Sequence, residues 1–222
     1  MITLVHENIN EIMELSADRP YVLIIENTVF FRSFIQQVMD NIDGIENQIV
    51  MSQNHELFKQ NDSVVMLRDF FDFDYKNKKI VCLLLKQLNS KMLANIYETN
   101  EIYQRGYNFI VRYLEEFDTK FILNDEIDIQ GFLKLYNPTI DIGSNPAEKL
   151  INYINLHIEF FRLQLIIFVD IQNFFNREEL EQILLHCKYK EVAVLLLQTD
   201  KKYDLTNEKI LIIDNDLCEI MI

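Results

Sequence analysis

The stretch "LQLIIFVDIQNFFNREELEQ", from Leu163 to Gln182, determines how the rest of the sequence is interpreted. It joins an apolar run, an acid at Asp170 and a polar segment with helical spacing. A short, almost wholly apolar run is typical of a strand buried on both faces of a parallel sheet. We therefore predict a strand that ends at Asp170, then a turn, and then a helix that covers 177–188. Strand, turn and helix together form a repeating unit of an α/β fold.

Similar patterns on both sides of this stretch extend the prediction. Apolar or β-branched runs predict seven further strands, and segments with a period of about 3.6 residues predict helices between them. The expected strands are "PYVLIIEN" (20–27), "NQIVMSQ" (47–53), "SVVMLRDF" (63–70), "KFILN" (120–124), "PTIDI" (138–142), "EVAVLLLQT" (191–199) and "EKILIID" (208–214). The expected helices are "VFFRSFIQQVM" (29–39), "IQGFLKLY" (129–136) and a longer one from Asn145.

The segment between Asn77 and Lys120 follows a different pattern. It contains no proline, Asn77 is a suitable N-cap, and its apolar residues fit two amphipathic helices with a break near "ETNE" (98–101). We predict an α/β head formed by 1–75 and 121–222, with a largely parallel sheet. Residues 76–120 are expected to form an extended helical leg inserted in that head.

In ATP-hydrolysing proteins, an acid placed like Asp170 often holds the magnesium of the nucleotide. A phosphate loop should accompany it, with glycines that admit the phosphates, then Lys and Ser or Thr. The nearest match is "GSNPAEKL" (143–150), but Glu148 occupies the position of the second glycine. A helix start explains this stretch better, with Asn145 as the N-cap, Pro146 at the first helical position and Glu148 completing a capping box. We therefore expect a head without a functional phosphate loop.

Composition limits the class of protein. Of the 222 residues, 49% are hydrophobic and 12% are aromatic, a content that suffices for one sizeable core and argues against disorder. The formal net charge is −14. The first residues lack the pattern of a signal peptide, and no apolar run approaches the ~20 residues that a membrane helix needs. We expect a cytoplasmic protein that makes no membrane contact. Cys82, Cys187 and Cys218 are interpreted as reduced core cysteines.

The charge is unevenly distributed. Residues 76–120 hold eight basic and five acidic side chains, a net charge of +3, whereas the remaining 13 basic and 30 acidic side chains give −17. Basic residues seven apart project from nearly the same side of a helix, and a row of them suits the phosphates of a duplex. An ordinary solvated helix face is the alternative. The candidate DNA-binding residues are Lys76, Lys78, Lys79, Lys86, Lys91, Arg105 and Arg112, with a weaker second cluster of Lys188, Lys190, Lys201 and Lys202.

Oxygen-bearing side chains gather where the leg is expected to return to the head. Carboxylates and amides are the ligands that Ca²⁺ prefers, although the spacing here is not that of an EF-hand. A calcium site and a solvated acidic turn both fit this pattern. The candidate metal ligands are Glu115, Glu116, Asp118, Asn124, Asp125, Glu126 and Asp128.

No arrangement of residues predicts catalysis. His6, His55, His157 and His186 are isolated in the sequence, and none stands near a Ser, Cys or carboxylate in the pattern of a triad. We predict that the protein is not an enzyme and assign no catalytic residue.

Several stretches, taken in order, resemble the Csn-two family of CRISPR-associated proteins from type II-A systems. Besides the opening stretch they are "YVLIIEN", "DFDYKNKKIVCLLLKQL", "FILNDEIDIQGFLKLYNPTID" and "KKYDLTNEKILIIDND", and together they extend from Tyr21 to Asp216. The resemblance implies a head related to ATPase folds but without a working phosphate loop, and a helical leg.

The resemblance also implies a function. Members of this family form tetrameric rings that bind ends of double-stranded DNA through a central hole, depend on calcium, and act in spacer acquisition. The implied partners are the CRISPR integrase proteins and the type II effector nuclease. Two other functions stay open from the residues alone: a divergent nucleotide hydrolase that uses Asp170, and an acidic scaffold that binds proteins and no DNA.

Overall fold

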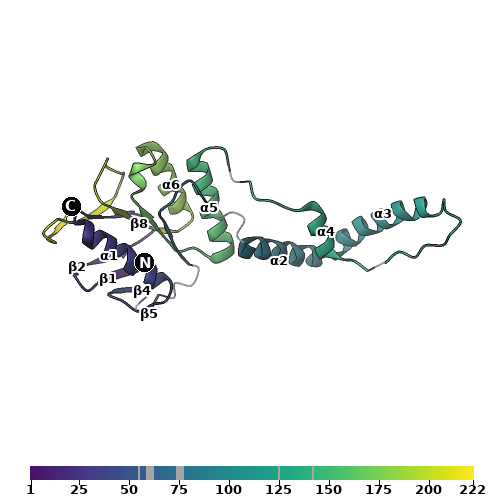
Figure 1. Cartoon of the computed structure of the whole chain (residues 1–222), viewed down its shortest axis with the longest axis horizontal. Coiled ribbons are helices and arrows are strands. Elements are labelled where there is room, and N and C mark those ends of the chain that lie inside the picture. The colour runs from purple at the N-terminus through teal and green to yellow at the C-terminus, as the bar shows by residue number, and fades with distance from the viewer. Residues whose placement is uncertain (55, 59–62, 74–77, 125, 142) are drawn as a thin grey trace. The chain divides into compact units, whose positions relative to one another are not determined.

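A computed structural model describes residues 1–54, 56–58, 63–73, 78–124, 126–141 and 143–222 (Figure 1). The chain forms two compact units. The first consists of Met1–Asp74 together with Ile142–Ile222, and the second of Tyr75–Asp141. Within the described residues, no helix combines the length and apolar composition that crossing a bilayer requires.

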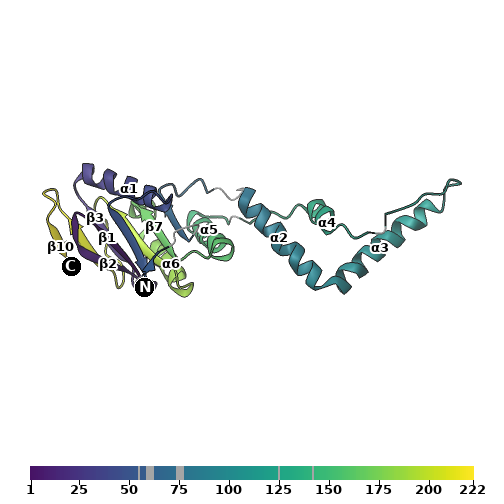
Figure 2. The ribbon, with the colours of Figure 1, turned by 90° about the horizontal axis from the view of Figure 1, so that it is seen from below.

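The first unit contains two sheets. A six-stranded sheet has the order β10-β9-β3-β8-β7-β6, in which only β10 is antiparallel to its neighbour. A four-stranded antiparallel sheet has the order β2-β1-β4-β5, and Figure 2 shows β1 and β2 beside one another. The strands are β1 (Ile2–His6), β2 (Ile9–Leu15), β3 (Tyr21–Ile25), β4 (Ile49–Gln53), β5 (Glu56–Leu57), β6 (Val64–Leu67), β7 (Leu165–Val169), β8 (Ala193–Gln198), β9 (Lys209–Ile213) and β10 (Glu219–Met221).

The helices divide between the two units. The first unit holds α1 (Thr28–Ile42), α5 (Pro146–Phe161), the short 3₁₀ helix η1 (Ile171–Asn173) and α6 (Arg177–Tyr189). The second unit holds α2 (Lys78–Ala94), α3 (Ile96–Leu114) and α4 (Ile129–Tyr136). The prediction of a mixed α/β protein with a parallel sheet is therefore confirmed.

The core of the first unit explains why β3, β7 and β8 are apolar along their whole length. Successive side chains of a strand point to opposite faces of its sheet. On one face, Leu23, Ile167 and Leu195 pack with Leu4 and Met13 of the smaller sheet and with α1. On the other face, the alternate residues are equally buried, and α6 contacts β8 there. Both faces of the parallel sheet are thus covered.

His6 is a buried polar residue where the smaller sheet meets α1. Its side chain is 1% exposed, and its ring lies 5.5 Å from that of Phe30 and 5.3 Å from that of Phe34. Nδ1 accepts a hydrogen bond from the backbone N–H of Asn8 at 3.1 Å, so Nε2 carries the proton and donates to Oε1 of Gln37 at 2.8 Å. Burial lowers the pKa of His6, because this environment suits the neutral ring.

Acidification from pH 7.5 to pH 5.5 is expected to destabilise the first unit. The folded-state pKa of His6 lies below its ordinary value of 6.5, so the unfolded chain takes up the proton first as the pH falls. The stabilising contribution is complete above pH 6.5 and is lost as the pH falls toward the folded-state pKa. His186, whose pKa is also lowered by burial, acts in the same direction. Urea denaturation at several pH values measures the effect, and His6→Gln should reduce the slope.

The second unit extends from Tyr75 to Asp141, whereas the sequence prediction assigned 121–141 to the head. Its secondary structure also differs from the prediction in two places. Residues 120–124 and 138–141 were predicted as parts of strands, but they are irregular in the structure, and Ile142 lies outside the described residues. No sheet is described in this unit, so these short apolar runs have no strand to pair with. The break between the two helices lies at Asn95 and not at 98–101. The hydroxyl of the buried Thr99 donates to the carbonyl of Met92 at 3.0 Å and so links α3 to α2 across this corner.

The cysteine prediction is correct for one residue of three. All three thiols are free, but only Cys187 is buried, where desolvation raises the pKa of its thiol to about 12. Cys82 on α2 and Cys218 before β10 are exposed. The apolar residues around Cys82 and Cys218 in the sequence do not show which side chains face the core, so the prediction for these two cysteines was wrong.

Candidate nucleic-acid interface

Helix α2 is the most basic element of the described chain. Its 17 residues carry four lysines and no acid. Lys78, Lys79 and Lys86 lie within about 100° of one another around the helix axis, whereas Lys91 is turned by about 140° from Lys86. All four side chains are exposed. The predicted row of cations therefore exists on one face of α2; Lys76, also predicted for DNA, lies outside the described residues.

Both arginines of α3 have a partner on their own helix. The Arg105 guanidinium pairs with the Glu101 carboxylate at 2.5 Å, one turn earlier on the same helix. Both side chains are largely exposed, so the pair stabilises the helix little, but it neutralises part of the positive charge. The Arg112 guanidinium lies 5.7 Å from the ring centre of Phe109.

The second predicted cluster is not a cluster in space. Lys188 and Lys190 lie at the end of α6, next to the start of β8, whereas Lys201 and Lys202 follow the far end of β8. A six-residue strand separates the two pairs by about 20 Å. The prediction grouped residues that lie at the two ends of one strand, β8.

Three of these four lysines also have acidic partners. Lys201 Nζ contacts Asp204 at 2.5 Å and Glu208 at 2.8 Å, and Lys202 Nζ contacts Asp200 at 2.6 Å. Lys188 Nζ lies 4.0 Å from an Asp18 carboxylate oxygen. These local pairs offset the positive charge, so the basic face of α2 remains the stronger candidate.

Asp170 connects two strands. It follows β7 with a left-handed backbone (φ 50°), and its Oδ1 accepts hydrogen bonds from the Thr199 amide at 2.9 Å and the Thr199 hydroxyl at 3.1 Å. Thr199 follows β8, so the carboxylate joins the ends of adjacent strands. Nearby, β3 passes into α1 through two residues, and the Asn27 side chain accepts from the first amides of α1, the donors that a phosphate loop would present.

Asp170→Ala is expected to lower the free energy of unfolding by about 1–3 kcal/mol, because it leaves two donors without their acceptor. Asp170→Asn should cost less, since the amide oxygen can still accept and Asn tolerates the left-handed backbone. Urea denaturation measures both. A nucleotide-binding signal in calorimetry that Asp170→Ala abolishes would instead favour the hydrolase alternative.

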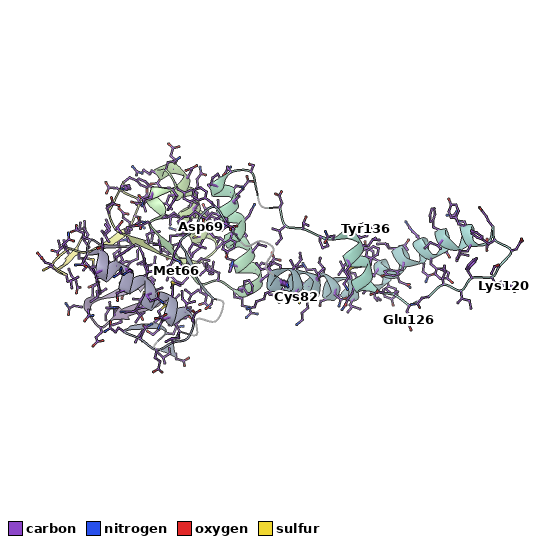
Figure 3. All side chains as sticks on the ribbon, in the orientation of Figure 1. Met66, Asp69, Cys82, Lys120, Glu126 and Tyr136 are labelled. Carbon is purple, nitrogen blue, oxygen red and sulfur yellow. The ribbon has the colours of Figure 1, made fainter. Side chains whose placement is uncertain are left out.

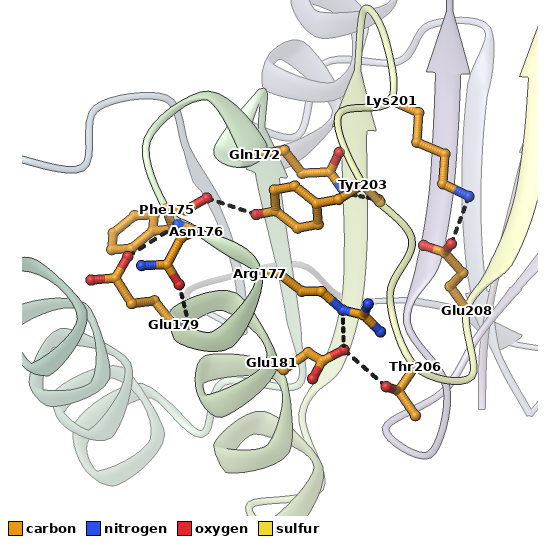
Figure 4. A network of polar contacts seen from close by, with 10 residues as sticks. All are labelled: Gln172, Phe175, Asn176, Arg177, Glu179, Glu181, Lys201, Tyr203, Thr206 and Glu208. Carbon is orange, nitrogen blue, oxygen red and sulfur yellow. Dashed lines mark hydrogen bonds and ion pairs between the residues drawn. The ribbon is translucent and has the colours of Figure 1, made fainter.

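The loop that follows β8 is fastened to η1 and α6 by hydrogen bonds (Figure 4). Gln172 accepts from the Lys202 amide at 3.0 Å and donates to the Tyr203 carbonyl at 3.2 Å. The Tyr203 hydroxyl donates to the Phe175 carbonyl at 2.7 Å, and burial raises the pKa of Tyr203 to about 12. The polar groups of this loop thus have hydrogen-bond partners within the protein.

The same network includes the start of α6. Asn176 and Glu179 form a complete capping box, with bonds of 2.9 and 3.0 Å. The Glu181 carboxylate accepts from the Thr206 hydroxyl at 2.9 Å and from Arg177 at 3.1 Å, which lowers the pKa of Glu181. Glu179 and Glu181 thus have structural roles.

The stretch that came nearest to a phosphate loop is a helix start. Asn145 caps α5 by accepting from the Glu148 amide at 2.8 Å, and Pro146 is the first helical residue. The predicted capping box is wrong in one detail, since the Glu148 carboxylate bonds the amide and hydroxyl of Ser144, at 2.9 and 2.8 Å, instead of the Asn145 amide. These bonds lower the pKa of Glu148.

The acidic residues proposed as calcium ligands do not form one described site. Among the residues that the structure describes, no three His, Cys, Asp or Glu side chains come close enough to hold a metal ion together. Asn124 accepts from the Glu126 amide at 3.1 Å, and Asp128 caps α4 by accepting from the Gly131 amide at 2.9 Å. Of the other predicted ligands, Glu115, Glu116 and Asp118 are exposed at the end of α3 and in the turn after it, and Asp125 lies outside the described residues.

Comparisons with known proteins identify the family. No curated protein sequence matches the chain. A solved structure from Pyrococcus furiosus, described provisionally as an ABC transporter ATP-binding protein, is similar with a TM-score of 0.45 and 7% identity, over 94% of this chain and 96% of the other. The family model described as "CRISPR-associated protein (Cas_Csn2)" matches residues 41–217, which include β4 to β9 and all of α2 to α6. The chain therefore belongs to the Csn2 family of CRISPR-associated proteins.

Proposed function

We propose that this protein acts in CRISPR adaptation by binding ends of double-stranded DNA without regard to sequence. The family match over residues 41–217 carries the proposal. The four lysines of α2 support it, because cations gathered on an otherwise anionic chain suit contacts to the phosphate backbone. Such contacts carry no base readout.

A homotetrameric ring is part of the proposal. One chain of this size does not encircle a duplex, and symmetric copies multiply weak phosphate contacts. The protein holds DNA without catalysis in this proposal, in the cytoplasm, and works with the CRISPR integrase proteins and the type II effector nuclease that the family resemblance implies. The proposed dependence of DNA binding on calcium comes from the same family resemblance. The described acidic residues do not supply a metal site within one chain, so no step is assigned to the ion.

A gel-shift titration tests the proposal. Linear and covalently closed circular duplexes of the same sequence are compared, each in calcium and in chelator. The proposal expects a shift of the linear duplex in calcium, at unrelated sequences, and little shift of the closed circle. Equal shifts of both topologies would remove the end requirement.

The assembly is tested separately. Analytical ultracentrifugation in calcium should give a mass about four times that of the chain, and chelator should reduce it. A monomer that ignores blunt-ended duplex under both conditions would leave the acidic-scaffold alternative.

A further inference from the structure

The second unit contains an apolar groove between α2 and α4, with a volume of about 650 Å³. Apolar side chains line it, among them Val81 and Leu85 of α2 and Leu133 of α4. Their faces are only partly covered: Val81 is 36% exposed, and Ile80 is the one α2 residue described as buried. A helix that leaves its apolar stripe uncovered in this way normally packs against another element.

Three lysines border this apolar surface. Lys78 and Lys86 lie on the α2 wall and Lys134 on the α4 wall. None of the three makes an ion pair within the part of the chain that the structure describes, and the residues that line the groove include no acid. The groove therefore combines an apolar surface with an uncompensated positive rim, in a chain whose net charge is −14.

The length of the groove indicates the shape of its occupant. On α2 the lining residues extend from Lys78 to Asn89, about 16 Å or three helical turns. On α4, Gln130, Leu133 and Lys134 follow the same three- and four-residue spacing. On α2 the lining residues form one continuous stripe, and α4 adds about one helical turn of wall beside it. A third helix can lay its apolar face along such a stripe.

The charges exclude two simpler occupants. Lys78 and Lys86 are about 12 Å apart along the axis of α2, so an amphiphile with one acidic headgroup meets only one of them. Duplex DNA meets the lysines, but its phosphates and sugars gain nothing from Val81, Leu85 and Leu133. Several carboxylates spaced along an apolar face satisfy both kinds of lining.

We propose that the groove between α2 and α4 binds an acidic amphipathic helix of a protein partner. Leucine-like side chains at three- and four-residue spacing enter the groove, and Glu or Asp residues on both flanks meet Lys78, Lys86 and Lys134. Since Lys86 also belongs to the basic face of α2, the helix and a duplex compete for it. The competition rests on the proposed function, whereas binding of the helix does not.

A synthetic acidic amphipathic peptide of about four turns, labelled with fluorescein, tests the site by fluorescence anisotropy with the full chain. A scrambled peptide of equal composition is the control for charge alone. Lys86→Glu with Lys134→Glu should lower the affinity at least roughly tenfold. Lys91→Glu, on another face of α2, should leave it unchanged, and circular dichroism checks that each variant is folded.

Cys82, which lines the groove and is labelled in Figure 3, provides a second readout. In a Cys218→Ser background, the exposed Cys82 and the buried Cys187 are the remaining thiols. Bound peptide should slow alkylation of Cys82 by a neutral reagent at least several-fold. The scrambled peptide should not.

Three results would overturn the proposal: equal binding of the scrambled peptide, an unchanged alkylation rate with peptide bound, or protection by oleate and not by peptide. Lys79→Glu separates this proposal from DNA binding, since Lys79 does not line the groove. Loss of duplex binding with intact peptide binding supports two distinct surfaces, whereas equal loss of both contradicts the assignment of the helix to the groove.

Discussion

Replacing both Lys79 and Lys86 by Glu is expected to weaken binding of linear duplex at least roughly tenfold, at every sequence tested. Both residues project from the basic face of α2, and each lost phosphate contact flattens the plot of log K against log salt by about one unit. The double variant should therefore flatten the slope by about two units per participating copy. Fluorescence anisotropy between about 50 and 200 mM salt measures both quantities.

The control for this variant lies on the same helix. Lys91→Glu makes the same change in net charge, but Lys91 is turned by about 140° from Lys86. Its effect on affinity should be clearly smaller than that of Lys86→Glu. If the two single variants weaken binding equally, net charge and not the face of α2 controls the interaction. An unchanged slope in the double variant would remove both lysines from the interface.

Replacing Phe168 by Ala is expected to lower the free energy of unfolding by about 3–5 kcal/mol. Phe168 is fully buried in β7, and its ring centre lies 6.1 Å from that of Phe70, which follows β6. The substitution leaves a cavity beneath a cluster of aromatic rings that joins the two strand ends. Urea denaturation followed by circular dichroism measures the loss, and the chain is expected to be unfolded at a temperature where the wild type is stable.

Phe174→Ala is the matched control, because it removes the same atoms from the same aromatic cluster. The Phe174 ring contacts Phe70 at 5.3 Å and Phe71 at 5.7 Å, but the side chain is 47% exposed. Less of its surface leaves water on folding, so a loss of about 1 kcal/mol is expected. Equal losses for the two variants would mean that the cluster does not pack against the sheet as described.

The strands of the parallel sheet could be predicted because both of their faces are buried. Such strands are apolar throughout, and β3, β7, β8 and β9 all lie where short apolar runs predicted them. The capped starts of α5 and α6 could be predicted for a similar reason, since a cap uses residues adjacent in sequence.

The smaller sheet was not foreseen in full. In β1 and β2 buried and exposed residues alternate, from Ile2 and Leu4 to Met13 and Leu15, which is the pattern of strands with one solvated face. Counting period-two alternation in the first fifteen residues would have found both strands. The short strands β5 and β10 carry too few residues for any such pattern.

The candidate site could be predicted only where it depends on one helix or one strand. The row of lysines on α2 follows from spacing alone. The separation of Lys190 from Lys202 follows from the strand predicted over 191–199, which lies between them. The bond from Thr199 to Asp170 depends on β7 and β8 being neighbours, and the groove depends on α4 packing against α2. These are contacts between distant parts of the chain, to which periodicity is blind.

The place of β3 in the parallel sheet has a consequence for synthesis on the ribosome. β3 lies between β8 and β9, which are translated roughly 170 and 190 residues later, so at about 5–20 residues per second it waits roughly 10–40 s for both neighbours. The smaller sheet and α1 lie entirely within the first 57 residues and are available to shield one side of it. The nascent polypeptide thus carries a fully apolar strand with open edges through most of translation, which makes β3 the natural place for a chaperone to engage.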